Sequence, residues 1–166
     1  PGGAEIPYVG GLYFLLLTGE IPTNEEAIEV EQTWHARSSI PDHVIKVLKE
    51  MPEQTAPMTL FSQAILSLQA DSIFTKRFEA GMRNNEYWEP MLEDSLNLTA
   101  KLPAIAALIY NLKHNGSEYI QKDPSLDWSA NFVKMMGIRD ETYEDLSRLY
   151  FMIHSNNESG NVSAHN

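Results

Sequence analysis

The sequence predicts an all-α protein, and three observations support that fold class. Proline and glycine divide the chain into segments of helical length. Within most segments the apolar residues recur at three- and four-residue spacing rather than alternating, as they do on one face of a helix. Helix start signals precede several of these segments. With 166 residues, 43% of them hydrophobic, the chain has the size of one ordinary domain or of a piece of a larger one.

Two helices are predicted in the first third of the chain. Thr23 followed three residues later by Glu26 is a capping-box pattern, which predicts a helix over about 24–38. A second helix should follow Pro41, which suits a first turn because its missing N–H would be unpaired there, and it should end before Pro52. Its apolar residues lie at i, i+3, i+4 and i+7, namely Val44, Val47, Leu48 and Met51.

The same spacing predicts two further helices after Pro57. A break near 71–72 should separate the third helix from a fourth, which carries Phe74, Phe78 and Met82. The third helix bears Leu60, Phe61, Ala64, Ile65 and Leu68 on one face.

The longest helical segment covers about 89–113 and is interrupted by Pro103. Because proline cannot donate to the carbonyl four residues back and its ring crowds that carbonyl, a kink is predicted near Leu102. From 102 to 112 the segment is apolar on nearly all sides. Such a helix is expected to be buried all round, either at the centre of a large protein or at a subunit interface.

Two helices are predicted at the end of the chain. The first covers about 128–136 and is closed by Gly137, and the second covers 140–154. On the second, one face carries Tyr143, Leu146, Tyr150 and Ile153.

Charge and composition argue against several classes of function. Twelve Lys and Arg against 23 Asp and Glu leave a net charge of −11, which disfavours binding to nucleic acid or to an anionic membrane surface. The longest apolar runs, 12–17 and 102–110, are too short to span a bilayer, so no membrane insertion is expected. There is no cysteine, and the five histidines show no metal-ligand spacing, so no metal site is expected.

Three acidic clusters lie in first turns of predicted helices. Solvated charge that complements the helix dipole is the favoured interpretation, and paired carboxylates for acid–base or metal chemistry are the alternative. The clusters are Glu25, Glu26 and Glu29; Glu89, Glu93 and Asp94; and Asp140, Glu141, Glu144 and Asp145.

The last segment is the most informative for function. From His154 the chain reads His-Ser-Asn-Asn-Glu-Ser-Gly-Asn-Val-Ser-Ala-His, a run of small polar residues after an amphipathic helix. A helix end that opens into a polar loop is the usual place for a site, although a simple cap and turn accounts for it equally well.

Several segments together resemble the citrate synthase family. Residues 11–23 read Gly-Leu-Tyr-Phe-Leu-Leu-Leu-Thr-Gly-Glu-Ile-Pro-Thr, which is similar to the family pattern Gly-Leu-(aromatic)-(aromatic)-Leu-Leu-x-Thr-Gly-x-(Ile/Val)-Pro. The similarity extends from about Gly10 to His165 and is greatest to the eukaryotic mitochondrial type. Further similar segments follow in the family's order: Pro57-Met58-Thr59, Tyr87-Trp88-Glu89 with Glu93-Asp94, Ala100-Lys101-Leu102-Pro103, residues 125–132 and residues 149–155.

The resemblance implies an acyltransferase of the citric acid cycle that condenses acetyl-CoA with oxaloacetate in the mitochondrial matrix. Acetyl-CoA would be a co-substrate, and no cofactor is implied; propionyl-CoA as the acyl donor stays open. In the family an Asp and two His carry the reaction, and their motifs, Pro-Leu-His-Gly and Gly-Tyr-Gly-His, do not occur here. No catalytic residue is therefore expected within this chain. Residues 1–166 should form part of the family's helical large domain, truncated before the small domain and not active alone.

The resemblance also places substrate-side residues in the last segment. In the family pattern His-Ser-Asp-His-Glu-Gly-Gly-Asn-Val-Ser-Ala-His, the second His binds oxaloacetate, and here that position is Asn157. Asn161 matches an Asn that lines the site, Ser163 matches a Ser that orients the first catalytic His, and His154 matches a supporting His. Because Asn cannot carry the positive charge of an imidazolium, this departure should weaken oxaloacetate binding. It also leaves open a non-catalytic relative, retained as a structural or assembly subunit of a larger complex.

Citrate synthases are dimers built by stacked helices, so the resemblance implies a homodimer through the helices at 58–71 and 89–113. This would explain the apolar surface of the long helix, which an isolated chain would expose to aggregation or chaperone binding. The expected interface residues are Met58, Phe61, Ile65, Leu68, Leu102, Ile105, Ala106 and Ile109.

Overall fold

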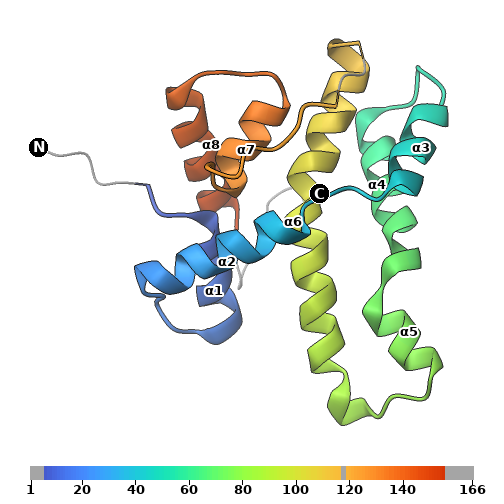
Figure 1. Cartoon of the computed structure of the whole chain (residues 1–166), viewed down its shortest axis with the longest axis vertical. Helices are drawn as coiled ribbons and strands as arrows, with labels where there is room; N and C mark the ends of the chain where they lie inside the picture. The colour runs from blue at the N-terminus through green and yellow to red at the C-terminus, as the bar shows by residue number, and fades with distance from the viewer. Residues whose placement is uncertain (1–5, 117–118, 156–166) are drawn as a thin grey trace, which may run out of the picture.

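The computed structural model describes residues 6–116 and 119–155, and the elements found within these ranges are all helical (Figure 1). Every helix that the sequence predicts is confirmed to within a few residues at its ends, except that the fourth ends at Glu79, so Met82, which is predicted to lie on it, is outside it. In chain order the elements are α1 (Val9–Thr18), α2 (Asn24–Arg37), α3 (Asp42–Glu50), α4 (Pro57–Ser67), the 3₁₀ turn η1 (Leu68–Asp71), α5 (Ile73–Glu79), the 3₁₀ turn η2 (Asn84–Glu86), α6 (Trp88–His114), α7 (Trp128–Met135) and α8 (Glu141–His154).

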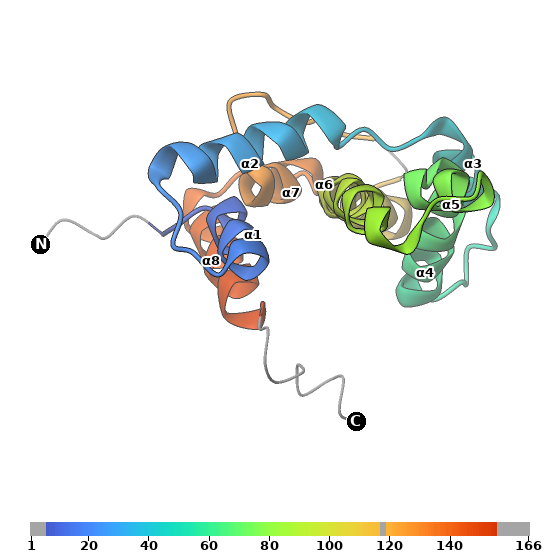
Figure 2. The same ribbon diagram turned by 90° about the horizontal axis from the view of Figure 1, so that it is seen from below.

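The long helix α6 divides the molecule into two groups of helices. On one side lie α1, α2, α7 and α8, and on the other lie α3, α4 and α5 (Figures 1 and 2). Both groups pack directly on α6, the first through α2 and α7 and the second through α4 and α5. The molecule therefore has two apolar cores that share α6.

The larger core joins α3, α4, the C-terminal half of α6 and the end of α7. Its buried residues include Val44, Leu60, Ala64, Ile105 and Leu108. The smaller core joins α1, α2 and the middle of α6 around Val9, Trp34 and Ala100, with Tyr13, Trp128 and Phe151 packed against it. Trp34 is the centre of this smaller core, because its ring lies 5.0 Å from the ring of Tyr13 and 5.6 Å from that of Trp128.

The helix ends follow the local signals in the sequence. At the start of α2 both halves of the capping box form: the Thr23 hydroxyl accepts from the Glu26 N–H at 3.2 Å, and the Glu26 carboxylate accepts from the Thr23 N–H at 2.8 Å. Pro57 is the first residue of α4, so this helix includes the proline after which it is predicted to begin. Pro41 instead precedes the first residue of α3, one position earlier than predicted.

Helix α1 is not predicted by the spacing of residues. Residues 12–17 stand out in the sequence only as an apolar run, whereas the structure has a helix over Val9–Thr18. Gly10 lets this helix approach α2 closely, because a Cβ there would lie 3.1 Å from the carbonyl oxygen of Ala27 and 3.0 Å from the carboxylate of Glu31. The helix ends at Gly19, whose φ of 76° is in the left-handed region.

Pro103 does not end α6, which continues as one helix on both sides of it. Because proline has no N–H, the carbonyl of Thr99 lacks its usual partner four residues ahead. The indole N–H of Trp128 donates to that carbonyl at 2.9 Å. The proline therefore leaves the Thr99 carbonyl of α6 free to accept a hydrogen bond from Trp128, the first residue of α7.

The C-terminal half of α6 is largely buried by the chain itself. Leu108 and Ile109 lie in the larger core, whereas Tyr110 is partly exposed. Asn111 is buried and donates to the carbonyl of Met135 at 2.8 Å, which satisfies a carbonyl at the end of α7. The all-round apolar pattern is therefore explained mainly by packing within the chain.

Candidate functional site at the end of helix α8

His154, the last residue of α8, is the one predicted site residue that the described part of the chain contains. Its side chain is exposed, its Nδ1–H donates to the carbonyl of Tyr150 at 2.9 Å, and its ring stacks on that of Tyr150 with centroids 4.0 Å apart. Asn157, Asn161 and Ser163 lie outside the described residues. Their part in substrate binding stays a prediction. The structure does describe the contacts that position α8, the helix that precedes these residues in the chain.

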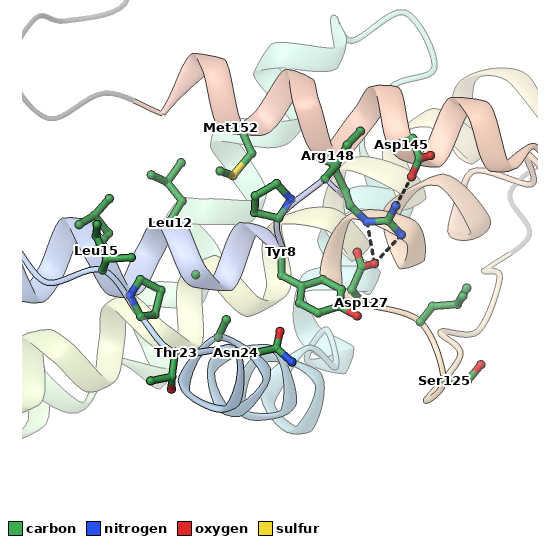
Figure 3. A pocket seen from close by; sticks show the side chains of 17 residues that line it. Tyr8, Leu12, Leu15, Thr23, Asn24, Ser125, Asp127, Asp145, Arg148 and Met152 are labelled. Atoms are coloured by element: carbon green, nitrogen blue, oxygen red, sulfur yellow. Dashed lines mark hydrogen bonds and ion pairs between the residues drawn. The ribbon is translucent and has the colours of Figure 1, made fainter. Parts of the chain in front are cut away.

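An ion pair holds α8 against α7. Two nitrogens of the Arg148 guanidinium, Nε and Nη2, donate to Oδ2 of Asp127 at 2.8 and 2.6 Å (Figure 3). The other Asp127 oxygen caps α7 by accepting from the N–H groups of Ser129 and Ala130 at 2.9 and 3.0 Å. The side chains are only 15% and 9% exposed. Burial alone would lower the pKa of Arg148, but the hydrogen bond to Asp127 raises it, so the guanidinium stays charged.

Glu31 of α2 joins three helices. One carboxylate oxygen accepts from the N–H of Gly10 in α1 at 2.8 Å, and the other accepts from the N–H of Trp128 in α7 at 2.7 Å. Burial raises the pKa of Glu31 above its usual value of 4.5, because the loss of solvent outweighs the two N–H groups that favour the charged form.

The turn before α7 is held mainly by side chains of α7 itself. Asn131 accepts from the N–H of Asp123 at 2.7 Å and donates to the carbonyls of Asp123 and Leu126 at 2.9 and 2.8 Å. Hydrogen bonds from Lys134 and Ser125 hold the pKa of Asp123 well below its usual range. This turn sets the position of Asp127, and through Asp127 the position of α8.

A groove of about 1020 Å³ lies beside this clamp, between α1, the start of α2 and α8. Its walls combine apolar side chains such as Leu12, Leu15 and Met152 with Arg148, Asp127 and Asp145 (Figure 3). Arg148 also donates to Asp145 at 2.5 Å, so the charged side chains that line the groove are joined to one another. Residue spacing along the chain does not predict this groove, because its walls come from four separate segments that meet only in the folded structure.

Six of the eight predicted interface residues line two surface grooves, and the other two do not. Met58, Phe61, Ala106 and Ile109 line an apolar groove of about 310 Å³ between α4 and α6, and Ile65 and Leu68 line a second groove beside α6. Ile105, in contrast, is 0% exposed in the chain's own core, and Leu102 is half-buried. Ile105 therefore has no surface to offer a partner, and the interface itself stays a prediction.

The acidic cluster on α6 has structural partners. Asp94 accepts from the Ser72 hydroxyl at 2.6 Å and from the N–H groups of Ile73 and Phe74 at 2.8 and 3.0 Å, and so caps α5 from another helix. Glu93 pairs with Arg37 of α2 at 2.6 Å. These carboxylates join helices, which neither interpretation of the cluster from sequence foresaw.

Residues 6–116 and 119–155 contain neither a candidate metal site nor a candidate membrane-spanning helix. Among these residues, no three His, Asp or Glu side chains are grouped so that they could hold a metal ion. No helix within the same ranges has both the length and the apolar character needed to cross a membrane.

Comparison of the sequence with known families and proteins yields one consistent result. The family described as "Citrate synthase, C-terminal domain" matches residues 9–166. A probable mitochondrial citrate synthase from Glossina morsitans morsitans is 48% identical over 98% of this chain and 35% of its own length. The mitochondrial citrate synthase of Kajikia audax is 45% identical over 99% of this chain and 35% of its own length. The chain thus spans about a third of the length of these curated relatives.

Solved structures agree on the fold. The citrate synthase of Pyrobaculum aerophilum superposes with a TM-score of 0.78 at 22% identity, covering 90% of this chain and 38% of its own. The Thermoplasma acidophilum citrate synthase, solved as a ternary complex with carboxymethyl coenzyme A and oxaloacetate, gives 0.74 at 17% identity, covering 94% and 39%. The class of protein is therefore an all-α protein with the fold of the matching part of these solved structures. On the family match, the chain belongs to the citrate synthase family.

Proposed function

We propose that this chain is part of a citrate synthase that condenses acetyl-CoA with oxaloacetate to form citrate. The observation that carries the proposal is the family match over residues 9–166, together with 48% identity to a probable mitochondrial citrate synthase over 98% of this chain. The names of the curated relatives also support a mitochondrial location, in the matrix where this acyltransferase reaction serves the citric acid cycle.

The chemistry divides between this chain and residues beyond it. A carboxylate base must remove a very weakly acidic methyl proton while a donor stabilises the enolate oxygen. In the family an Asp and two His do this, and their motifs are not in these 166 residues. The part proposed for this chain is to present the oxaloacetate side of the site, with His154, Asn157, Asn161 and Ser163, from the end of α8.

The proposed partner is a second copy of the chain. The groove between α4 and α6, lined by Met58, Phe61 and Tyr110, supports a homodimer through these two helices because it is an exposed apolar surface on an otherwise acidic protein.

The first test is oxaloacetate binding and citrate formation by the intact polypeptide and its Asn157→His variant. An imidazole at this position supplies a stronger, partly charged donor to the anionic substrate, so the variant should bind oxaloacetate about tenfold tighter. Isothermal titration gives the affinity, and a thiol-release assay with acetyl-CoA gives the rate.

The neighbouring Asn156→His variant is the matched control and should not tighten binding. If neither the natural polypeptide nor Asn157→His binds oxaloacetate or forms citrate, the enzymatic proposal is wrong. A structural or assembly subunit that retained the family's fold would then account for the protein.

A further inference from the structure

The inference concerns a small space beside the smaller core, where α2, α6 and the start of α7 meet. A cavity of about 20 Å³ lies between Trp34 of α2, Ala100 and Pro103 of α6, and Trp128 of α7. Polar side chains, among them Glu31 and Lys122, line the same cavity. The space is therefore both small and polar on part of its wall.

Trp34 brings a hydrogen-bond donor that the surrounding protein does not satisfy. Its side chain is 1% exposed, and its indole Nε1–H has no hydrogen-bond partner. The indole of Trp128, on the same cavity, shows the usual arrangement because it donates to the carbonyl of Thr99 at 2.9 Å. A buried N–H without a partner is costly, so the one on Trp34 needs an explanation.

Glu31 brings spare acceptor capacity to the cavity. Each of its two oxygens accepts one backbone N–H, from Gly10 and from Trp128. An ionised carboxylate offers about four acceptor positions, so two remain. Lys122 brings donors, since its ammonium uses two of its three protons on the His35 carbonyl and the Ser38 hydroxyl.

We propose that the cavity binds one ordered water molecule, which accepts from Nε1 of Trp34 and donates to the carboxylate of Glu31. A water needs about 10–15 Å³ and two to four polar partners, which this cavity supplies, whereas a larger ligand does not fit. The water completes the hydrogen bonding of Trp34 and links α2 to the α6–α7 junction. Glu31 thereby holds α1, α7 and the core tryptophan together.

The rival arrangement is an N–H···π contact. The Tyr13 ring meets the Trp34 ring edge-to-face, at 5.0 Å and an interplanar angle of 69°. An indole N–H directed at an aromatic face would need no water. The two arrangements differ in whether water lies beside Nε1.

Nuclear magnetic resonance of the intact polypeptide, labelled with ¹⁵N-tryptophan, separates them. The Trp34 Hε1 proton should show a nuclear Overhauser cross-peak to water with the sign of a long-lived, bound molecule. Trp128 is the internal comparison: it lines the same cavity, but its N–H donates to the Thr99 carbonyl, so its Hε1 peak to water should be weaker than that of Trp34. The exposed Trp88 should show only the opposite-signed contact with bulk water.

The Trp34 cross-peak to water and its response to a Ser38→Ala substitution decide the proposal. A Trp34 cross-peak that persists in Ser38→Ala, which removes a nearby exchangeable hydroxyl, supports bound water. A Trp34 cross-peak that is absent, or lost in Ser38→Ala, overturns it. A crystal structure provides the second measurement: a density peak at about 2.7–3.2 Å from Nε1 of Trp34 supports the proposal, and an empty cavity contradicts it.

Discussion

Three side chains, Glu31, Asp94 and Asp127, show how carboxylates are used in this protein. Each accepts from at least two groups, and each connects its own helix to another one. In a sequence, the same residues are indistinguishable from solvated surface charge. Their role follows from burial, because a carboxylate removed from water must find donors within the protein.

At Glu31 the raised pKa leads to a testable pH dependence. Because burial favours the protonated form in the folded state, the stability that protonation contributes is fully present below the ordinary pKa of 4.5 and is lost as pH rises through the raised value. We expect the unfolding free energy of the natural protein to fall relative to that of Glu31→Gln across this window. Urea unfolding of both proteins, at a series of pH values from about 4 upward, measures the difference. A difference that stays constant or moves in favour of the natural protein would contradict the assignment.

Polar contacts at helix ends add to the apolar packing that joins the helices. Asp127 caps α7 with one oxygen and binds Arg148 of α8 with the other, so one side chain contacts both helices. No side chain of α8, all of whose residues the structure describes, is fully buried, and apolar packing therefore contributes less here than in α6.

Loss of Arg148 should therefore be costly. Arg148→Met leaves Asp127 without its counter-charge in a site that is only 9% exposed, and we expect a loss of about 3 kcal/mol in unfolding free energy. Arg77→Met is the matched control, since it breaks an exposed pair with Glu89 at the same 2.6 Å separation and should cost about 1 kcal/mol or less. Chemical denaturation compares them, and equal losses would show that the clamp is no stronger than a surface ion pair.

The junction of α6 and α7 makes a prediction about coupling. Trp128→Phe removes the donor to the Thr99 carbonyl, which should cost about 1–3 kcal/mol because Pro103 offers no replacement. In a Pro103→Ala background the new N–H can reach that carbonyl, so the cost of Trp128→Phe should be smaller. A double-mutant cycle of unfolding free energies measures this coupling, and strictly additive costs would refute it.

In the whole molecule, as far as its residues are described, two of the exposed apolar surfaces stand out. One is the groove between α4 and α6, and the other is a stripe along α8 that the sequence analysis placed on one face. The predicted face comprises Tyr143, Leu146, Tyr150 and Ile153, the structure adds Leu149 to the stripe, and all five are exposed. Exposed apolar surfaces of this kind are typical of contacts with other protein. The curated relatives are about three times as long as the segment that matches this chain.

The proposed dimer predicts which of two similar residues matters. Met58 and Leu66 both lie on α4 and are 71% and 69% exposed, but only Met58 lines the groove against α6. Met58→Glu in the intact polypeptide should place a charge in the apolar interface and shift the protein toward monomer. Leu66→Glu should leave the oligomeric state unchanged. Analytical ultracentrifugation measures both, and a dimer that tolerates Met58→Glu would exclude this groove as the interface.

Patterns along the chain were enough to predict the fold class, the helices from residue 24 onward and the family. These depend on local spacing, on caps such as Thr23 with Glu26, and on short segments such as 11–23, all of which are readable along the chain. For the candidate site, the sequence placed Asn157, Asn161 and Ser163 only through the family resemblance, and that placement is still a prediction.

Tertiary structure alone decided which faces are covered and which charges are paired. Ile105 and Met58 are both apolar at helical spacing, yet one is buried in the chain's own core and the other faces outward. Arg148 meets Asp127, Glu31 meets Gly10 and Trp128, and Trp128 meets the carbonyl that Pro103 leaves free. These contacts join residues from about 20 to nearly 100 positions apart, and because burial and hydrogen bonding depend on distance in space, no pattern along the chain records them.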